Sequence, residues 1–196
     1  MPKNYKAEDF KADISVDDYI ARFRDSDKFL EYCKECRNYG NSWGCPPFDF
    51  DQLSFMLQWK YLRLWAVKIT PEEQGLPLSA AQEFIRPERI RIERAQLEME
   101  KKYSGRSFAY VGKCLYCDSC TRPEGKPCRH PELVRPALEA FGFDIGKTLS
   151  ELFNIEIKWS NDGKMPEYLT LVSGFFYNGK SDSIDDFYNN DIGTVK

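Results

Sequence analysis

The residues of this sequence best suited to chemistry are its seven cysteines. Cys114, Cys117 and Cys120 follow one another at Cys-x2-Cys-x2-Cys spacing, and ligands three apart in a loop can wrap one compact cluster. Bacterial ferredoxins use this run for three of a cluster's irons and take the remaining thiolate from a more distant cysteine that precedes a proline. A single zinc ion has no use for the third cysteine, so the run favours a 4Fe-4S cluster.

Two cysteines compete to be the fourth ligand. Cys128 is the nearer in sequence, and closing a short loop costs less entropy than joining distant segments. Arg129 and His130 beside it could donate hydrogen bonds or charge to the cluster's sulfides. Cys45 precedes Pro46, as the remote ligand of a ferredoxin does. We expect Cys128 to be the ligand and keep Cys45 as the alternative.

The first group of cysteines supplies three thiolates, from Cys33, Cys36 and Cys45. Three protein ligands on a cubane leave one iron open for a substrate or a further ligand, much as catalytic zinc sites keep an open position. One alternative is a zinc site of these cysteines completed by His130 or a carboxylate. Another is that the three thiols supplement a single cluster.

Two further interpretations involve no iron. In a zinc ribbon, one structural ion would be held by Cys33, Cys36, Cys117 and Cys120. Alternatively, the cysteines would pack in an inert core, although the Gly, Pro and Lys residues around them argue against this. Disulfides are not expected, because Met1 to Lys11 lacks the apolar region of an export signal and cytosolic thiols stay reduced.

Composition excludes several classes of partner. Lys and Arg number 28 against 31 Asp and Glu, spread along the chain, so no basic face for nucleic acid is predicted. No stretch approaches the roughly 20 apolar residues of a membrane span. The 42% of hydrophobic residues is enough to build a core. We expect a cytoplasmic protein.

The first cysteine group is predicted where a helix passes into an irregular loop. Apolar residues at helical intervals predict helix over residues 15–36, with Ser26 capping a second segment that begins at Asp27. Glycines and prolines then predict an irregular loop over 37–47. The next expected elements are a short helix near 51–60 and a buried strand over 62–69.

The second cysteine group is predicted to follow a long helix and a strand. A capping-box pattern at Ser79 and Gln82, with Pro87 at a helix start, predicts one long, kinked, mostly solvated helix. Its apolar face would comprise Ile92, Ala95, Met99 and Tyr103. The later expected elements are a strand over 107–111, a helix from Pro131 or Pro136 that Gly142 ends, a helix over 144–153, and a hairpin of strands 155–159 and 168–176 joined at 161–163.

Together these elements predict an α+β fold, in which helices cover a small, mainly antiparallel sheet and the cysteine-rich loops cluster at one end. We expect a single cysteine-rich metal-binding domain over residues 1–177. It would comprise an N-terminal helical cysteine segment over 15–60 and an α+β part over 61–177. The polar residues 178–196 predict a flexible acidic tail.

The two cysteine motifs resemble those of a known family, the predicted metal-binding proteins with domain of unknown function 2284. Cys33 to Phe48 resembles its first motif, and Gly112 to Asp144 resembles its second. The resemblance spans most of residues 30–176 and implies a prokaryotic protein expected to carry iron-sulfur clusters, with no established reaction. The tail after Tyr177 is this chain's own addition. The resemblance extends the ligand role to every cysteine: Cys33, Cys36, Cys45, Cys114, Cys117, Cys120 and Cys128.

From the residues and the resemblance we expect a 4Fe-4S protein, with one cluster or two, that passes single electrons to a protein redox partner. One alternative is an iron-sulfur enzyme that binds substrate at the open iron of the three-cysteine site. The other is a zinc-stabilised binding module without redox activity. The sequence has no phosphate-binding glycine loop, nucleophile elbow or zinc-protease motif, so no catalytic residue is predicted.

Overall fold

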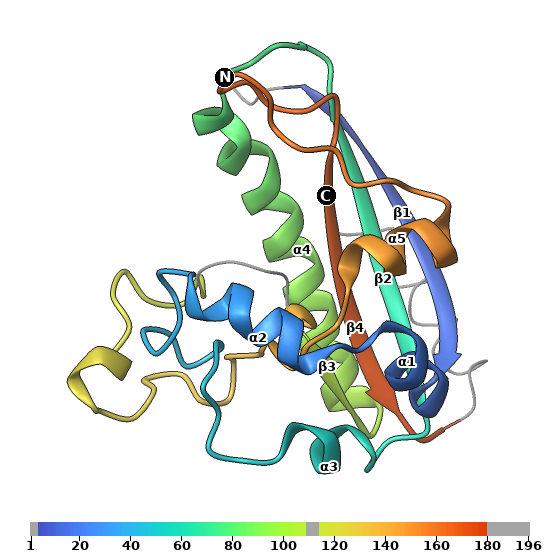
Figure 1. Ribbon diagram of the computed structural model, residues 1–196, viewed down its shortest axis with the longest axis vertical. Coiled ribbons are helices and arrows are strands. Elements are labelled where there is room, and N and C mark those ends of the chain that lie inside the picture. Colours follow the sequence, from blue (N-terminus) through green and yellow to red (C-terminus); the bar gives the residue numbers. More distant parts are fainter. Residues whose placement is uncertain (1–3, 109–113, 180–196) are drawn as a thin grey trace.

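A computed structural model describes residues 4–108 and 114–179. Its central element is a four-stranded antiparallel sheet with the strand order β1-β2-β4-β3 (Figure 1). The strands are β1 (Tyr5–Ser15), β2 (Tyr61–Pro71), β3 (Gly105–Phe108) and β4 (Leu169–Tyr177). β2 pairs with β1 on one side and β4 on the other, so it forms the middle of the sheet.

Helices cover both faces of this sheet, which confirms the α+β prediction. The α-helices are α1 (Val16–Phe23), α2 (Ser26–Lys34), α3 (Gln52–Met56), α4 (Ala81–Lys102) and α5 (Ile145–Phe153). Three short 3-10 turns are η1 (Leu78–Ala80), η2 (Arg122–Glu124) and η3 (Glu139–Phe141). In the described residues, no helix is long and apolar enough to cross a membrane.

The long helix α4 packs against one face of the sheet (Figure 1). Ile92 and Met99 of its predicted apolar face are fully buried against strand residues such as Trp65 and Phe175. Eight of its 22 residues are buried, so it is less solvated than predicted. The predicted capping box is wrong, because Ala80 occupies the N-cap position without any side-chain cap.

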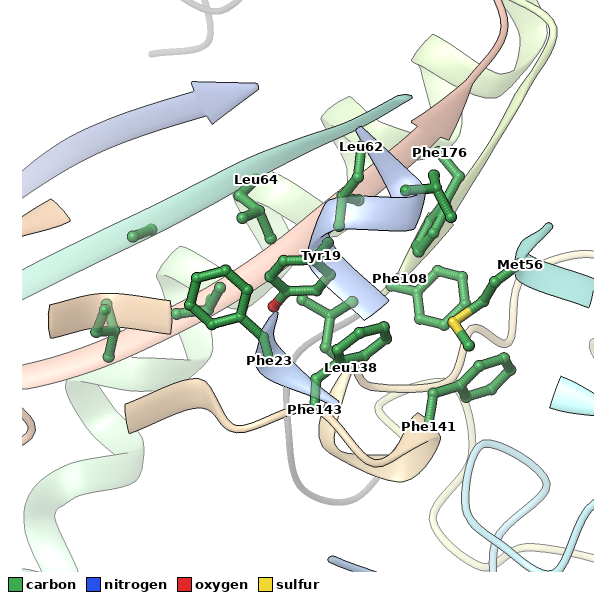
Figure 2. Close-up of a cluster of buried hydrophobic side chains, with 14 of the residues drawn as sticks. Tyr19, Phe23, Met56, Leu62, Leu64, Phe108, Leu138, Phe141, Phe143 and Phe176 are labelled. Atoms are coloured by element: carbon green, nitrogen blue, oxygen red, sulfur yellow. The ribbon is translucent and has the colours of Figure 1, made fainter. Parts of the chain in front are cut away.

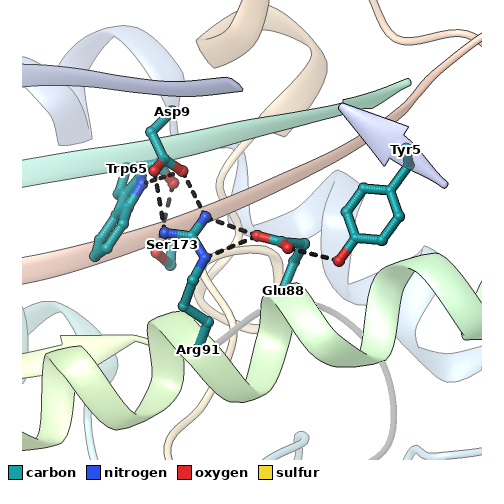
Figure 3. A network of polar contacts seen from close by, with 6 residues as sticks. All are labelled: Tyr5, Asp9, Trp65, Glu88, Arg91 and Ser173. Atoms are coloured by element: carbon teal, nitrogen blue, oxygen red, sulfur yellow. Dashed lines mark hydrogen bonds and ion pairs between the residues drawn. The ribbon is translucent and has the colours of Figure 1, made fainter. Parts of the chain in front are cut away.

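A polar network fastens α4 to the edge strand β1 (Figure 3). Arg91 Nη2 donates a hydrogen bond to Asp9 Oδ1 at 2.7 Å, and Arg91 Nε donates one to Glu88 Oε2 at 2.8 Å. The Tyr5 hydroxyl donates to the other oxygen of Glu88 at 2.8 Å. These bonds supply partners for partly buried charges, which would otherwise oppose the packing of the helix on the sheet.

The opposite face of the sheet carries the larger aromatic core (Figure 2). Because side chains alternate along a strand, Leu62 and Leu64 of β2 and Phe176 of β4 point to this face. Tyr19 stacks on Phe143 with ring centroids 4.4 Å apart, which packs α1 against the segment before α5. This core therefore supports the chain between residues 137 and 153, which includes one wall of the site described below.

The N-terminal strand and the helix boundaries differ from the sequence prediction. β1 was not predicted, because its many charged residues are typical of an exposed edge strand. The predicted helical region over 15–36 is confirmed as two helices, separated at Arg24, and the second begins at Ser26, one residue before the predicted Asp27. Asp25, rather than Ser26, caps the second helix by accepting a hydrogen bond from the Lys28 backbone nitrogen at 3.1 Å. The short helix after Asp51 and the buried strand β2 are confirmed.

The predicted C-terminal hairpin is wrong, although its second strand and its turn are confirmed. Residues 155–159 are not a strand, and the partners of β4 are instead β2, along its whole length, and β3, at Gly174–Tyr177. The turn has positive φ values at Asp162 and Gly163. The predicted helix before Gly142 is only the 3-10 turn η3, which Gly142 ends with a φ of 88°. Helix α5 is confirmed.

Two predictions extend beyond the described residues. The strand predicted over 107–111 corresponds to β3, and residues 109–113 lie outside the described part. Of the predicted tail, residues 180–196 lie outside it as well.

Candidate metal centre

The two cysteine loops contact each other through Arg122, at the start of η2. Its Nη1 donates hydrogen bonds to the carbonyl oxygens of Ser42 at 2.7 Å and Cys45 at 2.5 Å, and its Nη2 donates one to the carbonyl oxygen of Pro47. The guanidinium also lies over the Trp43 ring, 5.2 Å from its centroid. In Figure 1 the yellow loop around η2 accordingly lies beside the blue loop that follows α2.

The first of two cavities at this contact is lined by the four cysteines predicted to hold a cluster. We call it the four-cysteine cavity, and its volume is about 90 Å³. Its cysteines are Cys114, Cys117, Cys120 and Cys128. Trp43 and Tyr116 contribute apolar surface to its wall, and Arg129 contributes a cation.

The second cavity is lined by the remaining three cysteines. We call it the three-cysteine cavity, and its volume is about 120 Å³. These three are Cys33, Cys36 and Cys45. Asn38, Ser42 and Cys114 line both cavities, so the two share a wall. Six of the seven cysteines thus line one cavity each, in the two groups that their spacing in the sequence suggests, and Cys114 lines both.

Local backbone structure positions the three-cysteine group. Cys33 lies in the last turn of α2, and the Cys36 backbone nitrogen bonds the Cys33 carbonyl oxygen at 3.0 Å just beyond the helix. The following loop closes when the Gly40 nitrogen bonds the Pro46 carbonyl oxygen at 2.8 Å. Gly44 lies close to the chain that follows the second cysteine group: a Cβ at this position would lie 3.2 Å from the carbonyl oxygen of Arg135. Glycine therefore suits this approach of the two loops.

The sulfur atoms lie in surroundings that disfavour an unligated thiolate. Burial raises the pKa of the Cys33, Cys45 and Cys114 thiols, and the neighbouring Cys36 raises that of Cys33 further. A hydrogen bond from the Tyr116 backbone opposes part of the rise at Cys114. A cation bound in either cavity would reverse these shifts, because metal ligation deprotonates a thiol.

All seven cysteines are free thiols, so none is used in a disulfide. Within the described residues, no three His, Cys, Asp or Glu side chains are grouped tightly enough to hold a metal ion. The sulfur atoms instead line the walls of the two cavities. A site for one water molecule needs roughly 10–15 Å³. Each cavity therefore has room for a group much larger than a single ion.

His130 contacts the four-cysteine group chiefly through its backbone. Its N–H donates a hydrogen bond to Cys128 Sγ at 3.4 Å. Its imidazole is 40% exposed and lies 3.9 Å from a carboxylate oxygen of Glu132. The side chain does line the cavity, but the sulfur contact needs no imidazole.

Two residues of the site were not predicted as functional from the sequence. Arg135 lines the three-cysteine cavity and binds Glu100 of α4 through two hydrogen bonds, of 2.8 and 2.6 Å. Glu139 lines the same cavity, and burial raises the pKa of its carboxyl to about 7. Both lie in the range Gly112 to Asp144 that resembles the second motif of the family. The partner of Arg135 lies 35 positions away along the chain, so spacing alone gave it no role.

Comparison with known proteins assigns the chain to a family. A family model for predicted metal-binding proteins, domain of unknown function 2284, matches residues 20–174. The chain belongs to this family. The matched segment contains all seven cysteines and the residues that line both cavities. No curated protein and no solved structure matches the chain.

Proposed function

We propose that this metal-binding protein is a cytoplasmic iron-sulfur protein, which holds a 4Fe-4S cluster in the four-cysteine cavity and exchanges single electrons with a protein partner. One observation is the main support. Cys114, Cys117, Cys120 and Cys128 line a single cavity of about 90 Å³. Four thiolates around one space are the ligand set that a 4Fe-4S cluster requires.

The size of the cavity favours a cluster over a lone zinc ion. Zinc–sulfur bonds are about 2.3 Å long, so four sulfurs on one zinc ion would leave almost no space between them. The four-cysteine cavity has several times the roughly 10–15 Å³ that one water molecule needs. A cluster fills such a space with its own iron and sulfide atoms.

The division of the cysteines also counts against a zinc ribbon. That interpretation needs Cys33 and Cys36 to share one ion with Cys117 and Cys120. The first pair lines the three-cysteine cavity, whereas the second pair lines the four-cysteine cavity. One ion would have to draw both pairs out of the cavities that they line.

When bound, a 4Fe-4S cluster supplies one-electron oxidation and reduction. The residues of this chain would set how readily that happens. The His130 N–H donates to the Cys128 sulfur, and Arg129, anchored by a 2.8 Å hydrogen bond to the Ser119 carbonyl oxygen, places a cation on the cavity wall. Both contacts stabilise negative charge on the sulfurs and so raise the reduction potential. Trp43 and Tyr116 contribute apolar surface to the same wall, which would lower the access of water to a cluster.

A second centre in the three-cysteine cavity is part of the proposal. The two cavities share the wall formed by Asn38, Ser42 and Cys114, so two centres would be close neighbours. The cytoplasm suits seven free cysteines, because its thiols are kept reduced. The net charge of −3 gives no reason to expect a nucleic-acid partner.

Metal analysis of anaerobically purified protein tests the proposal. We expect a brown protein that contains iron and sulfide in equal amounts and bleaches on reduction. Cys120→Ser should lose the iron of the four-cysteine cavity, and Cys128→Ser should do the same. Colourless protein with stoichiometric zinc and no sulfide would overturn the proposal.

A matched substitution separates the two candidates for the fourth ligand. If Cys128 is that ligand, Cys45→Ser leaves the iron of the four-cysteine cavity in place and removes only the second centre. If Cys45→Ser instead empties the four-cysteine cavity, the ligand assignment is wrong. Electron paramagnetic resonance of the reduced variants distinguishes these outcomes, because each centre has its own signal.

A further inference from the structure

Glu139 presents an unpartnered carboxylate oxygen at the three-cysteine cavity. The residue as a whole is half-buried, but its Oε2 atom is buried and has no hydrogen-bond partner among the described residues. A buried polar atom without a partner costs free energy, and a carboxylate costs more than a neutral group. Such an atom in a folded protein calls for a specific cause, of which an ion is one.

The cations nearest to this cavity are bound to other carboxylates. Arg89 and Arg135 both line the cavity beside Glu139. Arg89 donates to Glu93 at 2.7 Å, and Arg135 donates to Glu100 at 2.6 Å. Neither guanidinium provides a hydrogen bond to Glu139 Oε2. A cation for this oxygen would therefore have to come from outside the described side chains.

The backbone fixes Glu139 opposite the cysteines. It begins the 3-10 turn η3, which packs against α2, the helix that carries Cys33. The Asp25 nitrogen donates to the Gly142 carbonyl oxygen at 2.8 Å, so the two segments are joined by a backbone hydrogen bond. Glu139 is also close enough to Cys33 to raise the pKa of its thiol electrostatically, after burial and Cys36. The carboxylate and the sulfurs thus share one cavity on a fixed framework.

We propose that the Glu139 carboxylate is the fourth protein ligand of the metal centre held by Cys33, Cys36 and Cys45. This inference rests on the proposed function, because it requires metal in the three-cysteine cavity. Carboxylate oxygen binds iron and zinc alongside thiolate sulfur. The metal provides the charge partner that Oε2 lacks, and the carboxylate fills the coordination position that three cysteines alone would leave open. The centre is a three-sulfur, one-oxygen site.

The test uses the Cys120→Ser protein, in which the four-cysteine cavity should be empty, so that signals come from the second centre. Glu139→Gln keeps the size of the side chain but removes the anionic ligand. We expect the electron paramagnetic resonance signal of the second centre to change and iron loss to a chelator to become at least about tenfold faster. Glu139→Asp, which keeps a carboxylate, should restore part of the retention.

Stability of the metal-free protein separates ligation from a structural role. Without metal, Glu139→Gln removes an unpartnered buried carboxylate, so the apoprotein should unfold at the same or a higher denaturant concentration. A structural role would predict an apoprotein less stable than the parent. Glu124→Gln serves as the control, because Glu124 pairs with Lys126 on the surface at 2.7 Å and should change neither measurement.

The outcomes distinguish this inference from the proposed function. If the parent protein holds iron in the three-cysteine cavity and Glu139→Gln changes neither its spectrum nor its iron loss, the ligand assignment is overturned while the proposed function stands. If the parent protein contains no iron in either cavity, both fail. A destabilised Glu139→Gln apoprotein would also overturn the assignment, because it would assign the side chain a structural role.

Discussion

Arg122 Nη1 donates a hydrogen bond to the carbonyl oxygen of Cys45 at 2.5 Å, so the second cysteine loop holds the backbone of the first. The guanidinium bonds two more carbonyl oxygens of that loop, those of Ser42 and Pro47. A planar group with five N–H donors can serve several acceptors at once, whereas lysine would offer a single point charge. This one side chain therefore links the walls of both cavities.

Arg122→Gln should loosen the contact between the cysteine loops. Hydrogen bonds from a charged group are worth about 1.5–3 kcal/mol, so we expect a loss of about 2 kcal/mol in the free energy of unfolding and faster loss of iron. Denaturant unfolding and chelator assays measure these effects. Arg129→Gln is the matched control, since Arg129 bonds Ser119 within its own loop. Equal effects of the two substitutions would refute the bridging role.

Gly142→Ala should disturb the junction between η3 and α2. Gly142 has a φ of 88°, and a Cβ there would lie 2.7 Å from Ser26 Cα. Strain at positive φ costs roughly 1–2 kcal/mol, and the backbone clash adds to it, so we expect a loss of more than about 2 kcal/mol. Thermal unfolding measures it. Gly125→Ala, at a φ of 67° with open space around it, should cost only the strain.

The ion pair between Glu100 and Arg135 should make stability depend on acid pH. Burial opposes ionisation of Glu100, but hydrogen bonds from Arg135 and Ser107 outweigh it and hold the pKa of its carboxyl below the ordinary 4.5. The pKa of Glu100 is lower in the folded protein than in the unfolded chain. The pair's contribution to the free energy of unfolding is therefore present above about pH 4.5 and is lost as pH falls through the pKa of the folded state. It is therefore at full strength at neutral pH.

Glu100→Gln should accordingly cost about 3 kcal/mol in the metal-free protein at pH 7, because Arg135 is left unpaired. The difference from the parent should shrink as pH falls below about 4.5. Urea unfolding across this range measures it. Glu98→Gln is the control, because Glu98 forms an exposed pair with Lys101, and such pairs contribute about 0–1 kcal/mol. A difference that is constant with pH would contradict the argument.

His130→Ala should leave the iron content unchanged. The contact with the Cys128 sulfur comes from the backbone N–H, which alanine retains. Iron analysis of the variant, beside Cys128→Ser as the positive control for loss, gives the answer. Loss of metal from His130→Ala would mean that the imidazole is itself a ligand, as in the zinc site completed by His130.

Some of the architecture could be predicted because its causes are local. Helix α4 shows its apolar face in the spacing of Ile92 and Met99, and β2 is an apolar run of large residues. Gly142 ends its turn because glycine tolerates positive φ, a property that depends on that residue alone. The cysteines were recognisable as candidate ligands for the same reason, since their spacing is itself the signal.

Other features depend on contacts between distant segments. β1 is polar in sequence and became recognisable as a strand only through its pairing with β2. Residues 155–159 were predicted as a strand, yet the strands that pair with β4 are β2 and β3. Strand pairing is a property of two partners, so the sequence of one segment cannot decide it.

For this protein the sequence by itself determined which candidate metal ligands are present, because the number and the spacing of the cysteines are properties of the sequence alone. Only the tertiary structure decided how the cysteines divide between two cavities, and that Arg122 and Glu139 belong to the site. The physical reason is that a cavity wall consists of residues brought together from several segments. Arg122 meets its carbonyl partners only in the folded chain, and only there is Glu139 Oε2 buried without a hydrogen-bond partner among the described residues.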